Sequence, residues 1–384
     1  MTVTAVAIHG YRSIRDIHLP LRRLTVLVGG NGVGKTNLYR SLELLQAAAK
    51  GTLAEEVARE GGLGAVHFAG ELKRGDQPRV RLEATLDHIL EDRGLASYEA
   101  ELGFPPTYYN LELGFKTPSA AAFIEEAQVK SERLVLKQGQ KEIVLVERSG
   151  PAIWTRDEHG RRAAVESELL ASETALSSLR GGFPTLDAVR HSIASWRFYH
   201  GFRVDAESPL RKPGLAITSP MLNADGSNLA AVFATLRHIR EDSVDLDETI
   251  ESAFPGSRLI VPPPEKYAEF SMIFPDLPRR AFSAAELSDG TLHFLALCGA
   301  LLSYRLPPFI ALNEPETSLH PDLLPALAGL IAKAAERTQI WVVTHSHGLA
   351  NAIAEATGVT PREVVRRDGA TWIEGLTRFG EFDD

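Results

Sequence analysis

The chain has 384 residues, and 44% of them are hydrophobic, which is enough for two or three packed domains. Charged residues make up 24%, with 41 Lys and Arg against 50 Asp and Glu, so the formal net charge is −9. These values exclude wholesale disorder and a globally basic nucleic-acid-binding protein, but they leave a local basic patch open. The single cysteine, Cys298, excludes an intramolecular disulfide and a cysteine-rich metal site, and its apolar neighbours indicate core packing.

No segment has the pattern of a membrane span or a signal peptide. The longest apolar run, Phe294 to Leu302, is far shorter than the ~20 residues that cross a bilayer. Met1 to Ile8 lacks a basic start and a cleavage site. The sequence therefore predicts a cytoplasmic protein with no membrane partner.

The N-terminal segment predicts strands, then a glycine-rich loop, then a helix. Alternating or continuous apolar residues indicate strands at 2–8, 14–19 and 24–28. After the loop, Leu38, Leu42 and Leu45 recur at helical spacing, which predicts an amphipathic helix over 36–50.

The middle of the chain changes character near residue 78. Alternating runs separated by Gly, Pro and Asn predict an antiparallel sheet with strands at 79–86, 108–115, 127–136 and 141–147, including a hairpin turn at 137–140. Helices are expected at 163–180 and 227–253. The proline-rich stretch 254–278 is expected to be a connector with one short strand.

The C-terminal part alternates helices with buried strands. We expect a helix at 285–304, a strand at 308–312, a helix at 323–337 and a strand at 339–343. This order predicts an α/β fold with a parallel sheet, whose ligands bind at the carboxyl ends of the strands. No repeat or heptad run predicts a long coiled coil.

The loop after the strand at 24–28 fits the pattern G-x-x-x-x-G-K-[ST] in its required strand-to-helix context. Glycines let the backbone N–H groups turn toward phosphates, Lys35 adds a positive charge, and the Thr36 hydroxyl is a ligand for Mg²⁺. The alternative is an ordinary glycine-rich turn. The predicted nucleotide-binding residues are Gly29, Gly30, Asn31, Gly32, Val33, Gly34, Lys35, Thr36 and Asn37.

A second constellation follows the apolar strand at 308–312, where Asn313 and Glu314 begin the run Asn-Glu-Pro-Glu. This is a Walker B arrangement. Asn313 is the candidate residue for the Mg²⁺ shell, and Glu314 is the candidate general base for the attacking water. The alternative is a strand-to-loop junction with solvated acids.

Two further elements narrow the class of phosphate-loop protein. Ser288, Asp289 and Gly290 head a helix about twenty residues before Glu314, and a capped helix start presents unpaired N–H groups to an anion. His345 follows the buried strand at 339–343, and its similarity to the switch histidine of ABC-type ATPases implies a contact to the γ-phosphate. Its alternatives are a structural histidine or a metal pair with His347.

The stretch Ile8 to Asp16, the phosphate loop, and residues 313–321 together resemble the RecF, SMC and OLD branch of ABC-type ATPases. The Leu-Ser-x-Gly signature at 287–290 and the histidine at 345 are similar to that class too. The resemblance covers 1–50 and 281–350. It implies a P-loop NTPase with an ABC-type head, a mixed sheet flanked by helices, an antiparallel β subdomain and a helical insertion.

The resemblance also implies domains, cofactors and partners. The expected ATPase core is 1–50 with 281–384. Between these two parts the chain is expected to form a β-rich region at 51–150 and a helical insertion with a connector at 151–280. ATP and Mg²⁺ are the implied cofactors. Two heads are expected to form an ATP-dependent head-to-tail homodimer, in which Ser288, Asp289 and Gly290 meet the nucleotide held by the other head. Ser318 to His320 would cross that interface.

The chain departs from the family pattern at three points. Asn313 stands where the Walker B aspartate is expected, which keeps an oxygen but loses a charge, so slow turnover is expected. The middle region is too short for SMC coiled coils. Fewer than forty residues follow His345, so no Toprim nuclease domain is expected.

These observations predict an ATPase that couples nucleotide state to double-stranded DNA, in repair, or to a separate effector protein, in phage defence. The alternative is an ATP-gated dimeric binding module with little hydrolysis. A GTPase or kinase is a third reading, although no Asn-Lys-x-Asp motif is present. Basic residues of the middle region, with aromatics beside them, indicate either DNA contact or a half-buried strand with solvated charges. They are Arg161, Arg162, Arg190, Arg197, Arg203, Arg211 and Lys212, with Trp196, Phe198, Tyr199 and Phe202. Arg12 and Arg15 either reach a phosphate or lie on the surface.

Overall fold

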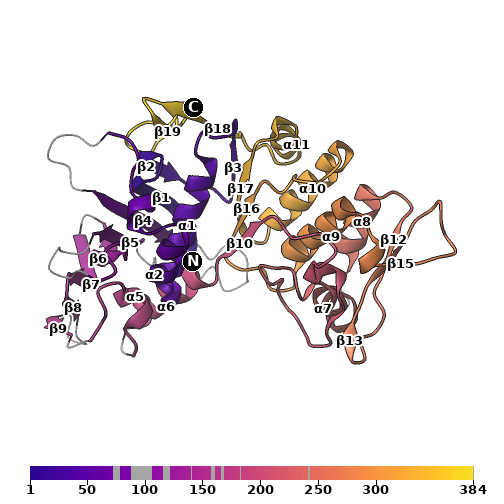
Figure 1. The fold of residues 1–384 in the computed structure, drawn as a ribbon, viewed down its shortest axis with the longest axis horizontal. Helices are drawn as coiled ribbons and strands as arrows, with labels where there is room; N and C mark the ends of the chain where they lie inside the picture. Colours follow the sequence, from indigo (N-terminus) through magenta and orange to yellow (C-terminus); the bar gives the residue numbers. More distant parts are fainter. Residues whose placement is uncertain are drawn as a thin grey trace. The chain divides into compact units, whose positions relative to one another are not determined.

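The structure is a computed structural model, and it divides into two compact units that are described separately (Figure 1). It describes residues 1–71, 78–87, 106–115, 122–139, 141–156, 161–165, 168–181, 183–240 and 243–383, so Gln140 of the expected hairpin turn lies outside the described residues. Unit 1 comprises 1–22, 30–196 and 363–384, and unit 2 comprises 23–29 and 197–362. The three-part domain division expected from the sequence stays a prediction.

Unit 1 is built around an eight-stranded antiparallel sheet in the order β2-β1-β4-β5-β6-β7-β8-β9. Alternate residues of β4 are buried, as expected when one face of a sheet covers a core. The four strands predicted in the middle region are confirmed, and the N-terminal strands β1 and β2 extend the same sheet. The strands are β1 (Thr2–Tyr11), β2 (Ile14–Pro20), β4 (Arg79–Asp87), β5 (Thr107–Gly114), β6 (Gln128–Gln138), β7 (Lys141–Ser149), β8 (Ala152–Arg156) and β9 (Arg162–Ala164).

The helices of unit 1 are mostly short. Among the described residues of this unit the longest helix is α1, which begins one residue before the predicted start, and the described helices are α1 (Lys35–Lys50), α2 (Leu53–Arg59), α3 (Leu63–Val66), α5 (Ala175–Ser178) and α6 (Pro184–Ala194). The hairpin of β18 (Arg362–Arg367) and β19 (Ala370–Ile373) completes the fold near the C-terminus.

The helix expected at 163–180 is wrong. The segment begins with β9, and α5 covers only one turn. Thr174 caps this turn by accepting a hydrogen bond from Ser177 N, and the buried Glu132 accepts from the N–H groups of Ala175 and Leu176. A local cap and a distant carboxylate therefore determine where this helix starts. Hydrophobic periodicity, on which the prediction relied, detects neither.

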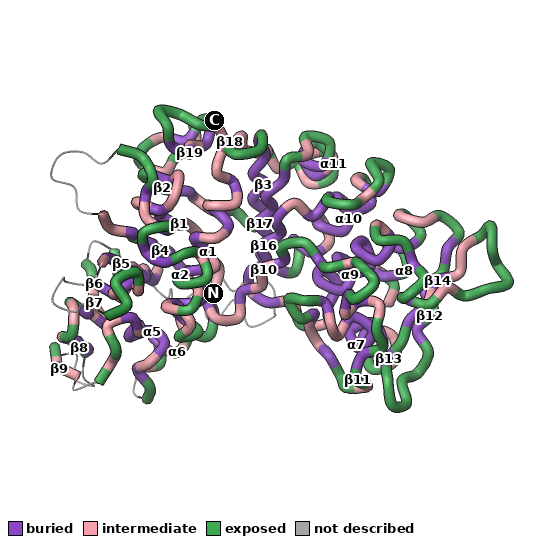
Figure 2. Tube along the Cα trace, viewed as in Figure 1, coloured by how far each residue is buried: buried purple, intermediate pink, exposed green. Residues whose placement is uncertain are grey.

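Unit 2 contains a parallel sheet in the order β10-β16-β17-β3. Figure 2 shows β3, β16 and β17 as buried along their whole length. This burial on both faces explains their continuous apolar sequences. The strands are β3 (Leu24–Val28), β10 (Arg197–His200), β16 (Phe309–Asn313) and β17 (Gln339–Thr344).

Two rings of the aromatic segment, in and just after β10, belong to the core of unit 2. Tyr199 and Phe202 are buried in the core of unit 2, and the Tyr199 hydroxyl donates to the Leu222 carbonyl at 3.1 Å. Burial raises the pKa of Tyr199 well above its ordinary value. These two rings pack the core, so they cannot stack on nucleic-acid bases.

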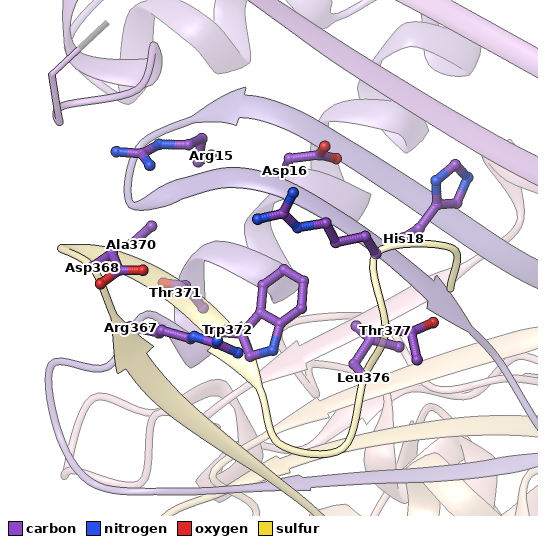
Figure 3. A pocket seen from close by; sticks show the side chains of 11 residues that line it. Arg15, Asp16, His18, Arg367, Asp368, Ala370, Thr371, Trp372, Leu376 and Thr377 are labelled. Carbon is purple, nitrogen blue, oxygen red and sulfur yellow. The ribbon is translucent and has the colours of Figure 1, made fainter. Parts of the chain in front are cut away.

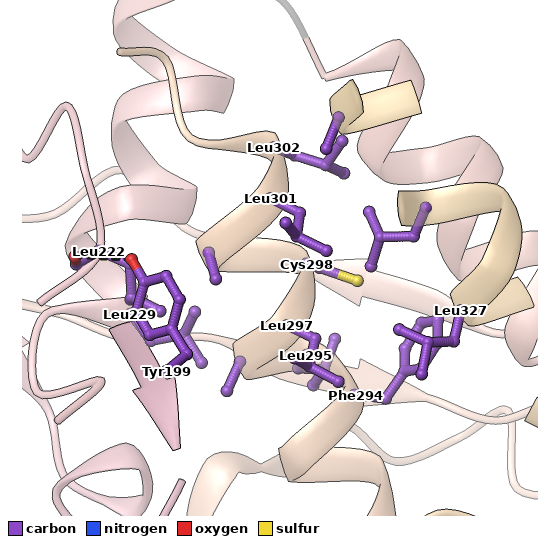
Figure 4. Packing of buried hydrophobic residues seen from close by; sticks show 14 of the residues in the cluster. Tyr199, Leu222, Leu229, Phe294, Leu295, Leu297, Cys298, Leu301, Leu302 and Leu327 are labelled. Carbon is purple, nitrogen blue, oxygen red and sulfur yellow. Dashed lines mark hydrogen bonds between the residues drawn. The ribbon is translucent and has the colours of Figure 1, made fainter. Parts of the chain in front are cut away.

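Helices cover the parallel sheet of unit 2. Cys298 lies on α9 among leucine side chains, which confirms its packing role (Figure 4), and burial raises the pKa of its thiol. The helices are α7 (Leu229–Ala234), a π-helix η2 (Thr235–Arg240), α8 (Val244–Ala253), α9 (Asp289–Leu302), α10 (Leu324–Ala335) and α11 (His347–Thr357), with 3₁₀ turns η1 (Pro209–Arg211), η3 (Ala284–Glu286) and η4 (Pro321–Leu323).

Two expectations for unit 2 need correction. The helix expected from 285 begins only at Asp289, because Leu287 and Ser288 are extended and Ser288 is the cap. The proline-rich connector holds more than one short strand, namely β12 (Arg258–Ile260), β13 (Tyr267–Ala268) and β14 (Ser271–Ile273). These pair with β11 (Gly214–Leu215) and β15 (Phe282–Ser283).

The described helices also bear on membrane insertion and on coiled coils. None of those in the described ranges is long and apolar enough to span a bilayer. The longest of them, α1, has 16 residues, so the described part of the chain contains no coiled-coil arm.

Candidate functional site

The phosphate loop leaves β3 at Gly29 and enters α1 at Lys35. Gly32 and Gly34 have φ values of +78° and +103°, which L-residues with a side chain rarely adopt. A Cβ atom at Gly30 or Gly32 would meet no described atom within 4 Å, so this side of the loop is open. The Lys35 side chain is buried, and its Nζ donates to the Gly30 carbonyl at 2.7 Å. The loop therefore curls around the lysine that the sequence predicts as the phosphate contact.

A hydrogen-bonded brace supports the loop from within unit 1. Thr371 of β19 donates its hydroxyl to the Val33 carbonyl at 2.8 Å and lies 2.6 Å from the Ser13 hydroxyl. Asn37 Nδ2 donates to Ser13 Oγ at 2.6 Å. A Cβ atom on Gly34 would lie 1.9 Å from Thr371 Oγ1, so a glycine is required there. Sequence reasoning assigned no role to Ser13, although it lies in the stretch Ile8 to Asp16, and it missed Thr371, which belongs to no motif.

Thr371→Val is expected to weaken nucleotide binding about three- to tenfold, since it removes one hydrogen bond to the loop while keeping the side-chain volume. Thr371→Ser keeps the hydroxyl and is expected to bind nearly as wild type does. Titration of a fluorescent ATP analogue measures both. Equal affinity of wild type and Thr371→Val would show that the brace does not shape the loop.

The carboxyl ends of β3, β16 and β17 lie at one edge of the unit 2 sheet. Val28 pairs with Thr344, and Val343 pairs with Asn313. The Glu314 N–H donates to the Val343 carbonyl at 2.7 Å, and Glu314 has a φ of 49°, which turns the chain sharply out of the strand. The sheet therefore brings the predicted Walker B residues next to the strand that carries His345.

His345 faces two carboxylates at this edge. Its Nδ1 lies 3.6 Å from Glu314 Oε1 and 3.2 Å from Glu316 Oε1. His345 and Glu314 are partly exposed, whereas Glu316 is only 8% exposed. The structure thus brings together two residues that the sequence predicts for catalysis.

Glu316 is a residue of this edge to which sequence reasoning assigned no role. Its Oε1 accepts hydrogen bonds from the Thr344 hydroxyl and from the N–H groups of His345 and Ser346, both at 3.2 Å. This carboxylate fixes the turn that follows β17 and therefore the direction of His345. The sequence signal that could have pointed to Glu316 is its position as the second acid of the run Asn-Glu-Pro-Glu.

Asn313 shows how this edge suits a cation. Its Nδ2 is bonded to His200 Nδ1 at 2.5 Å, while its Oδ1 is buried and has no hydrogen-bond partner among the described residues. A buried orphan oxygen is costly unless a ligand completes it, and Mg²⁺ prefers oxygen ligands. The residue at the Walker B aspartate position therefore fits a magnesium shell. His200, at the end of β10, is another residue that carried no sequence signal.

The signature segment forms a capped helix start in unit 2. Ser288 Oγ accepts from Thr291 N at 3.2 Å, and a Cβ on Gly290 would lie 2.9 Å from the Ser318 carbonyl oxygen. Gly290 thus allows the close approach of the segment predicted to be the D-loop. Asp289 is held by Arg211 through an ion pair of 2.6 Å.

Arg211 organises this segment from a distant point in the chain. Its side chain is 11% exposed, and its Nη1 donates to the carbonyls of Leu287 and Ala285 at 2.8 and 3.0 Å. Arg211 is one of the basic residues for which the sequence predicts either DNA contact or solvated charges. Its guanidinium is instead occupied by the signature loop.

The remaining candidates have defined surroundings. Arg12 Nη2 donates to Glu60 Oε2 at 2.8 Å, and the Tyr11 hydroxyl donates to the same carboxylate. The Arg12 side chain is therefore held in an ion pair. Arg15 lies over the ring of Phe68. Within the described ranges no group of three or more His, Cys, Asp and Glu side chains is arranged to hold a metal.

The parallel sheet, the phosphate loop and the signature helix have the fold of an ABC-type P-loop domain, similar to that of SMC heads. Residues 24–351 match the family described as "AAA domain, putative AbiEii toxin, Type IV TA system", and the chain belongs to this family. A search of curated proteins finds no match.

Solved structures support the same fold. The chain is similar to an SMC head bound to the C-terminal winged-helix domain of ScpA, with 17% identity, 97% of each chain covered and a TM-score of 0.52. It is also similar to the SMC head of Pyrococcus furiosus bound to the C-terminal domain of ScpA, with 16% identity, 97% and 95% coverage and a TM-score of 0.51. The SMC head of Pyrococcus yayanosii gives 13% identity, 99% and 98% coverage and a TM-score of 0.51.

Proposed function

We propose that this chain binds and hydrolyses ATP and uses the nucleotide state to control its own dimerisation. One observation carries the proposal. Strand β3, which leads directly into the phosphate loop, ends at the same sheet edge as Asn313, Glu314 and His345. In parallel α/β sheets, ligands bind at this edge.

Each predicted residue has a role in this reaction. Lys35 and the N–H groups of residues 29–36 hold the phosphates, and His345 contacts the γ-phosphate. Glu314 takes a proton from the attacking water, whose oxygen bonds to the γ-phosphorus while the bond to the leaving ADP oxygen breaks. Mg²⁺, when bound, neutralises phosphate charge, and the Thr36 hydroxyl and Asn313 Oδ1 are its ligands from this chain.

The capped start of α9 supports a head-to-tail dimer. Ser288, Asp289 and Gly290 stand at a helix N-terminus that presents N–H groups to an anion. We propose that they contact the nucleotide of a second copy, so that ATP closes the dimer and hydrolysis reopens it. The output is transmitted to double-stranded DNA or to a protein partner, as two of the similar SMC heads bind ScpA domains.

A second function is favoured by Asn313 alone. An amide attracts Mg²⁺ less than a carboxylate does, so turnover can be slow enough that the closed dimer is itself the signal. In that case the chain is an ATP-gated binding module that switches a separate effector.

Steady-state ATP hydrolysis, with and without double-stranded DNA, tests the two functions. Turnover that DNA accelerates would support coupling to DNA. A wild-type rate indistinguishable from that of Glu314→Gln would favour the gated module. Competition between GTP and ATP compares the two affinities. The GTPase hypothesis predicts that GTP binds more tightly.

Ser288→Arg is expected to leave ATP binding intact and to prevent ATP-dependent dimerisation, because a large cation replaces the cap that meets the partner's nucleotide. Light scattering with and without ATP measures the mass of the complex. The matched control is Ser303→Ala, at the other end of α9. A Ser288→Arg protein that stays monomeric yet hydrolyses ATP at the wild-type rate would contradict action in trans.

A further inference from the structure

Unit 1 contains a pocket whose lining, apart from Thr371, has no part in the proposed ATPase function. It has a volume of about 430 Å³ and is formed by β2, the β18–β19 hairpin and the segment that follows it (Figure 3). The basic side chains of its wall are Arg15, His18, Arg367 and Arg378, and its acids are Asp16 and Asp368. We propose that this pocket binds a small phosphorylated ligand that carries a planar ring, such as a nucleotide.

The charges of the wall favour an anion. Arg15, Arg367 and Arg378 are exposed and form no ion pair with any described residue. Of the two acids, Asp16 has its Oδ1 3.3 Å from His9 Nδ1, a contact that is an ion pair only when His9 is protonated. Three unpaired guanidinium groups around one concave surface can donate several charge-assisted hydrogen bonds to phosphate oxygens.

The aromatic surroundings orient these donors. The guanidinium of Arg15 lies over the Phe68 ring, 5.2 Å from its centroid. Stacking of this kind holds the planar group in place and leaves its in-plane N–H donors available to a ligand. Trp372 is half-buried in the same wall, and its indole presents a flat apolar surface for a ring. In Figure 3, Trp372 lies between Arg15 and Thr377.

The shape favours a small ligand over a nucleic-acid strand. A concave site of this volume matches the size range of small-molecule pockets. A strand would instead follow an extended stripe of positive charge. Nucleic-acid binding is therefore an outcome of the test that counts against the proposal.

The pocket also touches the brace of the phosphate loop. Thr371 forms part of the wall and donates to the Val33 carbonyl. A ligand that orders this wall is therefore placed to change nucleotide affinity, and any such coupling must be reciprocal.

The test uses the full chain with Lys35→Ala, so that ligands bound at the phosphate loop do not contribute. Calorimetric titration with pyrophosphate and with AMP is expected to show saturable binding at one site. Arg15→Gln and Arg378→Gln should each weaken it about tenfold, the loss expected for one charge-assisted hydrogen bond. Trp372→Leu should remove the advantage of AMP over pyrophosphate.

Arg366→Gln is the matched control, since Arg366 is exposed on the same strand as Arg367 but does not line the pocket. Circular dichroism checks that all variants fold. Absence of binding, or binding that Arg15→Gln and Arg378→Gln leave unchanged, would overturn the proposal. Binding of a single-stranded oligonucleotide without binding of AMP or pyrophosphate would also overturn it. Failure of the ATPase function would not affect these outcomes.

Discussion

Lys35→Ala is expected to reduce ATP affinity by about a hundredfold or more, because it removes the cation that the phosphate loop encloses. The Lys35 Nζ is held at the Gly30 carbonyl within a loop whose glycines leave its outer side open. Loss of this charge leaves the loop itself with only its neutral N–H groups to bind the phosphates. Binding of a fluorescent ATP analogue, measured by anisotropy, gives the affinity of both proteins.

The control for this result is Lys50→Ala, an exposed lysine at the other end of α1. It changes the net charge by the same amount but is distant from the loop in the helix. Thermal unfolding shows whether either substitution affects folding. An ATP affinity of Lys35→Ala within a few-fold of wild type would mean that nucleotide does not bind at this loop.

Glu314→Gln is expected to lower the rate of ATP hydrolysis by about 10² to 10⁴-fold, the usual contribution of a general base, while ATP binding is retained. Glutamine has the shape of glutamate but cannot accept the proton of the attacking water. The partial exposure of Glu314 and its position beside His345 suit this role, since water can reach it. Single-turnover hydrolysis separates the chemical step from product release.

Glu336→Gln is the matched control, because Glu336 is exposed at the end of α10 in the same unit. Trapped ATP should also make the Glu314→Gln dimer more persistent than that of wild type. Equal hydrolysis by wild type and Glu314→Gln would remove Glu314 as the base and favour the ATP-gated module.

Much of the candidate site could be predicted because its signals are local. The strand β3, the glycine loop and α1 are consecutive in the chain, and their boundaries in the structure lie within one residue of those expected. The same is true of β16 and of β17, which ends one residue before His345. Hydrophobic period and glycine spacing are properties of short segments, so they need no knowledge of the fold.

Other elements could not be predicted because their partners are far apart in sequence. Ser13 and Thr371 are separated by 358 positions, yet their hydroxyls lie 2.6 Å apart. Arg211 is 78 positions from Asp289 and forms an ion pair with it. The short strand β10 had too few residues for a clear period, and only its pairing with β16 shows that Tyr199 belongs to the core.

The sequence alone therefore determined the α/β class, the phosphate loop, the Walker B strand with its unusual Asn313, and the capped signature helix, since each depends on residues within about one turn or strand of one another. Only the tertiary structure decided that Glu316 holds His345, that His200 orients Asn313, and that Thr371 supports the loop. Hydrogen bonds act over about 3 Å in space whatever the separation along the chain, so these contacts exist only once the strands are paired.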